Sequence, residues 1–169
     1  MIILSKLADY GVIIACELAA RPEQQMTASA LAAGTRLPRA TVAKLLKALA
    51  HADIVSGARG AAGGYRLARN ARSISVAEVV AAIDGAIGIT QCTSHATQPF
   101  ASERVDRAAE MSTFVACDRA HFCPTRPHWQ RINAAVATAL GAVTLADMVA
   151  ERLAFALPAA LRSGEPLAP

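Results

Sequence analysis

The chain has 169 residues, a net charge of +4 and four cysteines. Apolar residues make up 54% of the chain but aromatic residues only 4%, so the hydropathy comes mainly from alanine. This composition excludes an intrinsically disordered chain and a disulfide-rich mini-protein, and no apolar run approaches the roughly 18 residues of a membrane span. Lys6, Asp9 and Glu17 interrupt the apolar start, which indicates a folded helix in a cytoplasmic protein rather than a signal peptide.

The charge is divided unevenly between the two halves of the chain. Residues 1–73 hold ten Lys/Arg and four Asp/Glu, a balance of +6, whereas residues 74–169 hold seven and nine, a balance of −2. Within 36–72 there are eight basic residues and a single acid, Asp53. This stretch is either a solvated surface or the footprint of a polyanion such as DNA, and charge alone does not choose between them.

The first half predicts three helices. Residues 5–20 have helical period, with Leu7, Ile14 and Leu18 on one face. Thr27 is a plausible N-cap for a short helix through Ala33, and Gly34 suits the left-handed position after it. Pro38 precedes a third helix over 39–51. In that helix Val42, Leu45, Leu46 and Leu49 are predicted to face inward, and Arg39, Thr41, Lys44 and Lys47 outward.

Residues 54–69 predict a β-hairpin, because two short apolar runs flank a glycine-rich connection. A hairpin directly after a helix-turn-helix is called a wing. The expected fold is therefore mostly α, a winged helix-turn-helix of three helices and a two-stranded wing, followed by a cysteine loop and a long helix.

The remaining elements follow the wing. Ser75 to Glu78 forms a capping box that opens a helix to Asp84, and Gly85 closes it. Residues 88–122 lack period, and helical pattern returns at 126–140 and again after Thr144. The expected domains are 1–86 for DNA binding, 87–125 for the cysteine loop, 126–157 for dimerisation helices and 158–169 for a flexible tail.

A recognition helix delivers its amino-terminal outward side chains to the major groove. Arg39, Thr41 and Lys44 are the candidates here, with Lys47 and Arg36 as backbone contacts. Arg59 is placed to enter a minor groove, and Gly60 gives the wing its conformational freedom. The alternative is an ordinary surface hairpin. The full set of predicted DNA-binding residues is Thr27, Arg36, Arg39, Thr41, Lys44, Lys47, Arg59, Gly60 and Tyr65.

Three of the four cysteines lie in the second half, at Cys92, Cys117 and Cys123, and His121 and His128 lie near the last two. Thiolates with histidines are ligands for zinc and for iron–sulfur clusters, and the spacing does not name the metal. A disulfide is a further alternative, which nothing in the sequence favours because export is not indicated. Cys16 lies among apolar residues of the first helix and is predicted to be core.

The sequence resembles the bacterial winged-helix iron–sulfur regulators of the IscR and NsrR type. The resemblance rests on Leu4-Ser5-Lys6, on Asp9-Tyr10, on the helix after Leu37-Pro38, and above all on the wing motif from Arg59 to Arg69. It continues through Ile83-Asp84-Gly85 to three cysteines and a late tryptophan, Trp129, and covers about residues 1–150. In detail the chain looks closest to the regulators of the SUF iron–sulfur assembly system.

The resemblance implies a cluster, 2Fe–2S or 4Fe–4S, held by Cys92, Cys117 and Cys123. Relatives of IscR type have a histidine as fourth ligand, and Arg126 stands at that position, where a guanidinium cannot coordinate metal. NsrR-type relatives use an aspartate near the start of helix 1, which matches Asp9; His128 and His121 are the alternatives. The chain departs from the family in having 24 residues between Cys92 and Cys117, an insertion of Thr93 to Ala116.

These observations predict a homodimeric transcriptional regulator that binds double-stranded promoter DNA and senses iron–sulfur cluster status. The alternative is a winged-helix regulator with a zinc or thiol-redox switch and no cluster. No phosphate loop, nucleophile elbow or acid–base pair points to an enzyme.

Overall fold

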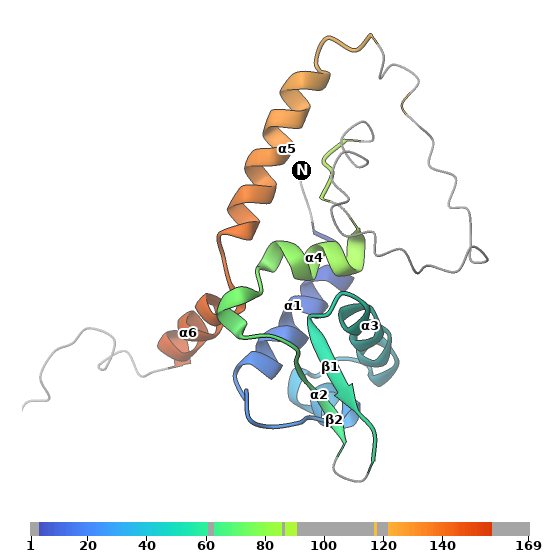
Figure 1. Cartoon of the computed structure of the whole chain (residues 1–169), viewed down its shortest axis with the longest axis vertical. Coiled ribbons are helices and arrows are strands. Elements are labelled where there is room, and N and C mark those ends of the chain that lie inside the picture. The colour runs from blue at the N-terminus through green and yellow to red at the C-terminus, as the bar shows by residue number, and fades with distance from the viewer. Residues whose placement is uncertain (1–3, 61–62, 86, 91–116, 118–121, 157–169) are drawn as a thin grey trace, which may run out of the picture.

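The structure is a computed structural model that describes residues 4–60, 63–85, 87–90, 117 and 122–156. The predicted order of elements is confirmed: three helices, a hairpin and then further helices (Figure 1). The helices are α1 (Lys6–Ala19), α2 (Ala28–Thr35), α3 (Arg39–His51), α4 (Val76–Asp84), α5 (Arg126–Gly141) and α6 (Leu145–Ala156), with strands β1 (Val55–Ala58) and β2 (Gly64–Leu67) and a 3-10 turn η1 (Ala71–Ser73).

Local sequence signals set the ends of these helices. The Ser5 hydroxyl accepts a hydrogen bond from the Ala8 amide (3.0 Å) at the start of α1, and Thr27 caps α2 through the Ala30 amide (3.1 Å). Such caps satisfy amides that have no partner inside the helix. Pro38 stands directly before α3, where its missing N–H has no cost.

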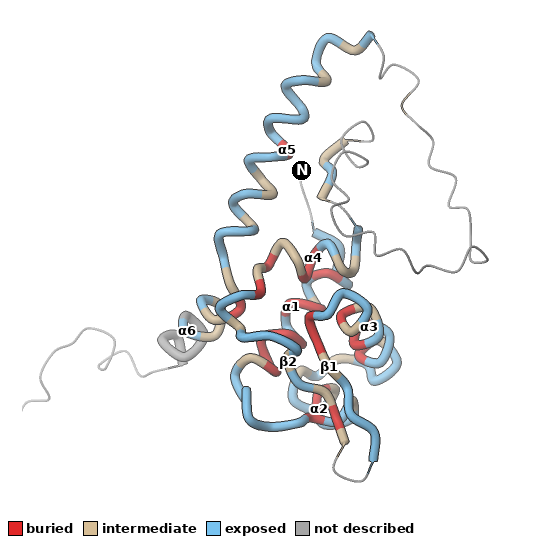
Figure 2. Tube along the Cα trace, viewed as in Figure 1, coloured by how far each residue is buried: buried red, intermediate tan, exposed pale blue. Residues whose placement is uncertain are grey.

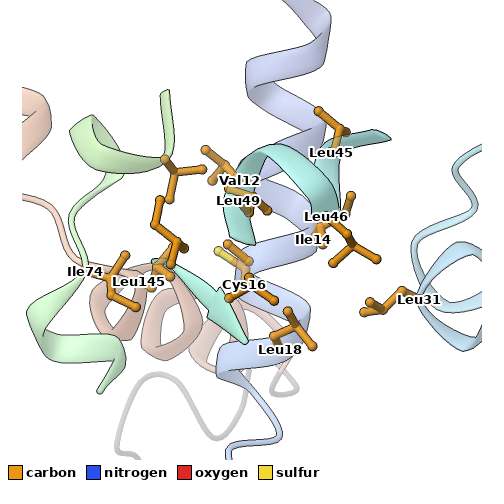
Figure 3. Close-up of a cluster of buried hydrophobic side chains, with 14 of the residues drawn as sticks. Val12, Ile14, Cys16, Leu18, Leu31, Leu45, Leu46, Leu49, Ile74 and Leu145 are labelled. Atoms are coloured by element: carbon orange, nitrogen blue, oxygen red, sulfur yellow. The ribbon is translucent and has the colours of Figure 1, made fainter. Parts of the chain in front are cut away.

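The core lies where α1 crosses α2, α3 and α4. Ile14 and Leu18 of α1 pack there with the predicted inward residues of α3, all of which are buried (Figure 3). Cys16 is 8% exposed in the same cluster, which confirms it as a core residue. Leu31 is the buried residue of α2, and its side chain attaches that helix to the core.

The wing is an antiparallel pair of strands in which Val55 lies opposite Leu67 and Ala58 opposite Gly64. Met26, just before α2, exchanges two backbone hydrogen bonds with Tyr65 (2.9 and 2.8 Å). The segment that leads into α2 therefore lies along the outer edge of β2, and it fixes the wing relative to the helix-turn-helix.

Three local predictions are wrong. Leu7 is 37% exposed, whereas its neighbour Ala8 is fully buried in the core, so the first turn of α1 faces the core through Ala8 and not through Leu7. Helix α2 runs two residues further than expected, so Arg36 (φ 57°) and not Gly34 takes the left-handed position. In the predicted capping box, the Ser75 hydroxyl does accept from the Glu78 amide, but the Glu78 carboxylate binds Arg69 instead of returning to the cap.

The last helices differ in how they are packed. Leu145 at the start of α6 is fully buried in the core beside Ile74, so α6 packs against the amino-terminal helices. Helix α5, in contrast, extends away from α4 and is exposed along most of its length (Figure 2). None of the helices in the described part of the chain is both long and apolar enough to span a bilayer.

Candidate DNA-binding surface and cysteine segment

The predicted DNA-binding side chains lie on α2, α3 and the wing. Arg39, Lys44 and Lys47 project from α3 and are exposed, and Arg36 is exposed in the turn before it. Thr41 is half-buried. Helix α3 presents these side chains because its apolar residues recur at three- and four-residue spacing and turn the basic ones outward.

The wing contributes Arg59 and Gly60, both exposed at its tip. Gly60 has a φ of 116°, a conformation that residues with a Cβ rarely adopt. Gly63 is equally constrained, because a Cβ there would lie 2.4 Å from the carbonyl oxygen of Ala58. The two glycines allow the tight reversal that places Arg59 at the tip.

Two of the predicted DNA-binding residues also have structural contacts. The hydroxyl of Thr27 is the N-cap of α2. Tyr65 is half-buried, and its ring edge lies close to Gly57 of the opposite strand. Tyr65 also lines an open hollow between β2 and the end of α3, together with Leu46, Lys47, Ala50 and His51.

At least one basic residue of the stretch 36–72 is bound to partners within the chain. Arg69, at the end of the wing, donates to the carbonyls of Asp53 (3.4 Å) and Ser73 (3.2 Å) and pairs with Glu78 of α4. Sequence reasoning missed this arrangement. The +6 balance of the first half thus includes at least one arginine that holds the wing to α4.

The candidate metal ligands are only partly described. Cys92 and His121 lie outside the described residues. Cys117 and Cys123 are half-buried, and the Cys123 sulfur lies 3.2 Å from the Thr125 hydroxyl just before α5. Within the part of the chain that the structure describes, no three His, Cys, Asp or Glu side chains come close enough to hold a metal ion.

Asp9 and His128 occupy the first turns of two helices and are exposed. The start of α1 is held against the end of α4, because the Ser5 hydroxyl donates to the Asp84 carboxylate (2.6 Å). Helix α4 leads directly into the segment that precedes Cys92. The structure therefore places Asp9 on the helix end nearest the entry to the cysteine segment.

One further residue of this region escaped sequence reasoning. Asn133 of α5 is 5% exposed, and its amide bonds to the backbone of residues 87 and 89 just after α4. The available signal was a single amide side chain in an alanine-rich helix, which is too common a feature to identify a contact.

Curated proteins of similar sequence are named as HTH-type transcriptional regulators. The HTH-type transcriptional regulator IscR of Xenorhabdus nematophila is 27% identical over 106 residues, which cover 63% of this chain and 53% of that protein. The chain thus spans about half the length of the curated relatives it matches. These relatives are named as transcriptional regulators and not as enzymes.

Two solved structures share the fold. CymR, described as the global cysteine regulator of B. subtilis, is 25% identical, with a TM-score of 0.63 and coverage of 89% of this chain and 98% of that one. IscR of T. potens is 22% identical, with a TM-score of 0.65 and 93% coverage of each chain. The second likeness shows the fold alone.

A family model for Rrf2, described as an iron-dependent transcriptional regulator, matches residues 4–151. This match includes the helix-turn-helix, the wing, the cysteine segment, all of α5 and the first seven residues of α6. The chain belongs to the Rrf2 family of winged-helix transcriptional regulators.

Proposed function

We propose that this chain binds double-stranded promoter DNA as a homodimer and that a metal or redox event at its cysteines controls the binding. The observation that carries the DNA-binding part is the combination of exposed basic residues on α3 with an arginine at the wing tip. Arg39, Thr41 and Lys44 would reach base edges in the major groove. Arg36 and Lys47 would contact phosphates, and Arg59 the minor groove.

Fluorescence anisotropy with duplex DNA tests this part. Lys47→Ala removes a proposed phosphate contact, so affinity should fall for all sequences and the salt dependence should decrease by about one unit of slope. Lys6→Ala removes the same charge from α1 and should leave both quantities unchanged. Equal effects of the two substitutions would mean that the attraction is non-specific and not centred on α3.

The homodimer is proposed from α5. This helix has a single buried residue among its sixteen, and it exposes Trp129 (37%) and Ile132 (45%). Alanine residues along its carboxyl-terminal half would allow a second copy to approach closely. Ile132→Glu should convert the dimer to a monomer in analytical ultracentrifugation and weaken DNA binding, because a two-fold site is read by two recognition helices.

For the sensing part, we propose an iron–sulfur cluster held by Cys92, Cys117 and Cys123, with Asp9 as fourth ligand and His128 or His121 as substitutes. The family description and the thiolate chemistry support it. The chain's own contribution would be the ligands, and the Ser5–Asp84 hydrogen bond, which keeps the start of α1 beside the end of α4. A cluster coupled to DNA binding typically changes affinity by about 5- to 150-fold.

Anaerobic purification with iron and sulfide measured per chain tests the cluster. The wild-type protein should be coloured, and the triple variant Cys92→Ala, Cys117→Ala, Cys123→Ala should hold neither element. Stoichiometric iron and sulfide in the triple variant would overturn the ligand assignment.

The second candidate is a winged-helix regulator with a thiol-redox or zinc switch. The likeness to the cysteine regulator CymR favours it. In this case the protein would be colourless, and either zinc would be found on it or DNA affinity would follow the oxidation of Cys117 and Cys123.

A further inference from the structure

Asn133 is a buried polar residue on a helix that is exposed along most of its length. It is 5% exposed, and it is the one residue of α5 classed as buried. A buried amide must have hydrogen-bond partners, because an unsatisfied polar group costs free energy. The partners of Asn133 therefore show what this position of α5 is built to contact.

Both polar atoms of the side chain bind one short stretch of backbone. The Oδ1 atom accepts from the amide of Ile89 (3.1 Å), and the Nδ2 atom donates to the carbonyl of Ile87 (2.8 Å). Ile87 also packs against the hydrophobic core. The segment after α4 is thus held between the core on one side and α5 on the other.

Helix α5 has a second attachment just after its carboxyl end, in the connection to α6. The Val76 amide donates to the Val143 carbonyl (2.9 Å), and the Leu145 amide donates to the Ile74 carbonyl (3.0 Å). Leu145 is fully buried, which anchors this end in the core. Asn133 lies eight residues before Gly141, or about 12 Å along the helix axis.

A helix that is attached to the rest of the fold at one point can change its angle, whereas attachment at two separated points fixes its direction. We propose that Asn133 is the positioning residue that sets the angle of α5 relative to the winged-helix unit. The amino-terminal part of α5 extends away from the unit, as Figure 1 shows. This inference rests on the proposed function, because in a dimer joined through α5 the angle determines the separation of the two recognition helices.

Hydrogen exchange in the DNA-free protein tests the contact itself. In Asn133→Leu, the Ile89 amide should exchange roughly tenfold faster than in the wild type, because its acceptor is gone. Gln130→Leu makes the same chemical change at an exposed position one turn away and should leave Ile89 protected. Unchanged protection of Ile89 in Asn133→Leu would overturn the proposal. Asn133→Ala admits water to both backbone groups and serves if the leucine variant does not fold.

DNA spacing tests the consequence. The wild-type chain is first used to enrich a DNA duplex from a random library. This duplex is then prepared in three forms: as selected, with one base pair added between its half-sites, and with one base pair removed. The wild type and Gln130→Leu should lose at least tenfold in affinity on either change. The Asn133 variants should lose less than threefold, with a melting temperature that still shows a folded protein. If the Asn133 variants keep the wild-type spacing preference although Ile89 exchanges faster, α5 is oriented by other contacts and the proposal is wrong.

The two experiments separate this proposal from the proposed function. Should the chain enrich no duplex at all, the DNA-binding proposal fails, while the exchange of Ile89 still decides whether Asn133 holds the segment to α5. If the Asn133 variants lose the contact with Ile89 but keep the iron content of the wild type, the ligand assignment is unaffected.

Discussion

Arg69, two residues after β2, forms an ion pair with Glu78 in the first turn of α4. The same guanidinium also donates to two backbone carbonyls, those of Asp53 and Ser73. One side chain therefore joins the turn after α3, the wing and the start of α4. Together with the backbone pairing of Met26 and Tyr65, these contacts hold the wing against the rest of the unit.

Arg69→Ala should lower the free energy of unfolding by about 1–2 kcal/mol, because it removes two carbonyl contacts and an ion pair that is partly exposed. Glu78→Gln should cost less, since the carbonyl contacts remain. Urea denaturation measures both. The neighbouring Arg66→Ala on the exposed side of β2 is the control and should change stability by less than about 0.5 kcal/mol. An equal cost for Arg66 and Arg69 would contradict the role of Arg69 in holding the wing.

Two glycines should respond to alanine with opposite signs. In Gly63→Ala the new Cβ would meet the backbone of Ala58 and Arg59, so the wing turn must open and stability should fall by about 1–3 kcal/mol. In Gly141→Ala at the end of α5 nothing lies within 4 Å, and alanine is the better helix former, so stability should rise by up to about 1 kcal/mol. Thermal unfolding measures the stability change in each variant. An increase in stability in Gly63→Ala would contradict the close approach of Gly63 to the Ala58 carbonyl.

Leu31→Ala should detach α2. Its side chain is fully buried and is the largest of the α2 side chains that pack into the core, the others being Ala28 and Ala32. A leucine-to-alanine change in such a site costs about 2–5 kcal/mol. Leu4→Ala, at a position that is 45% exposed, is the control and should cost far less. The measurement is urea denaturation, and a similar loss for both leucines would exclude Leu31 as the anchor of α2.

The cap of α6 should give a pH-dependent stability. Hydrogen bonds from the Thr144 hydroxyl and amide lower the pKa of Asp147 below its ordinary value of 3.8, with a smaller contribution from Arg72. Because the pKa is lower in the folded chain, the stabilisation is present above pH 3.8 and is lost as the pH falls through the folded value. Asp147→Asn should therefore be less stable than the wild type at neutral pH, and the difference should shrink below pH 3.8. An equal stability difference at every pH would contradict this role of Asp147.

Local patterns were enough to predict the elements of the amino-terminal unit. The helix over 39–51 follows from Pro38 and from the apolar spacing of its inward residues, and the wing follows from glycines between two short runs. Each of these signals depends on residues within one or two helical turns of one another. Caps, periodicity and turn residues act at that range, so the sequence alone determined the helix-turn-helix and the wing.

The contacts that orient these elements were decided by the tertiary structure. Asn133 bonds to backbone 44 and 46 residues earlier in the chain, and Ser5 bonds to Asp84 across 79 residues. In the sequence Arg69 is one basic residue among several, and only the structure shows its acceptors on Asp53 and Ser73. The chemistry of a side chain determines which groups it can bind. Its actual partner depends on which distant part of the backbone the fold brings within hydrogen-bond distance. That is why the sequence alone predicted a winged-helix DNA-binding regulator, and only the tertiary structure decided how α5 and the wing are attached to the rest of the fold.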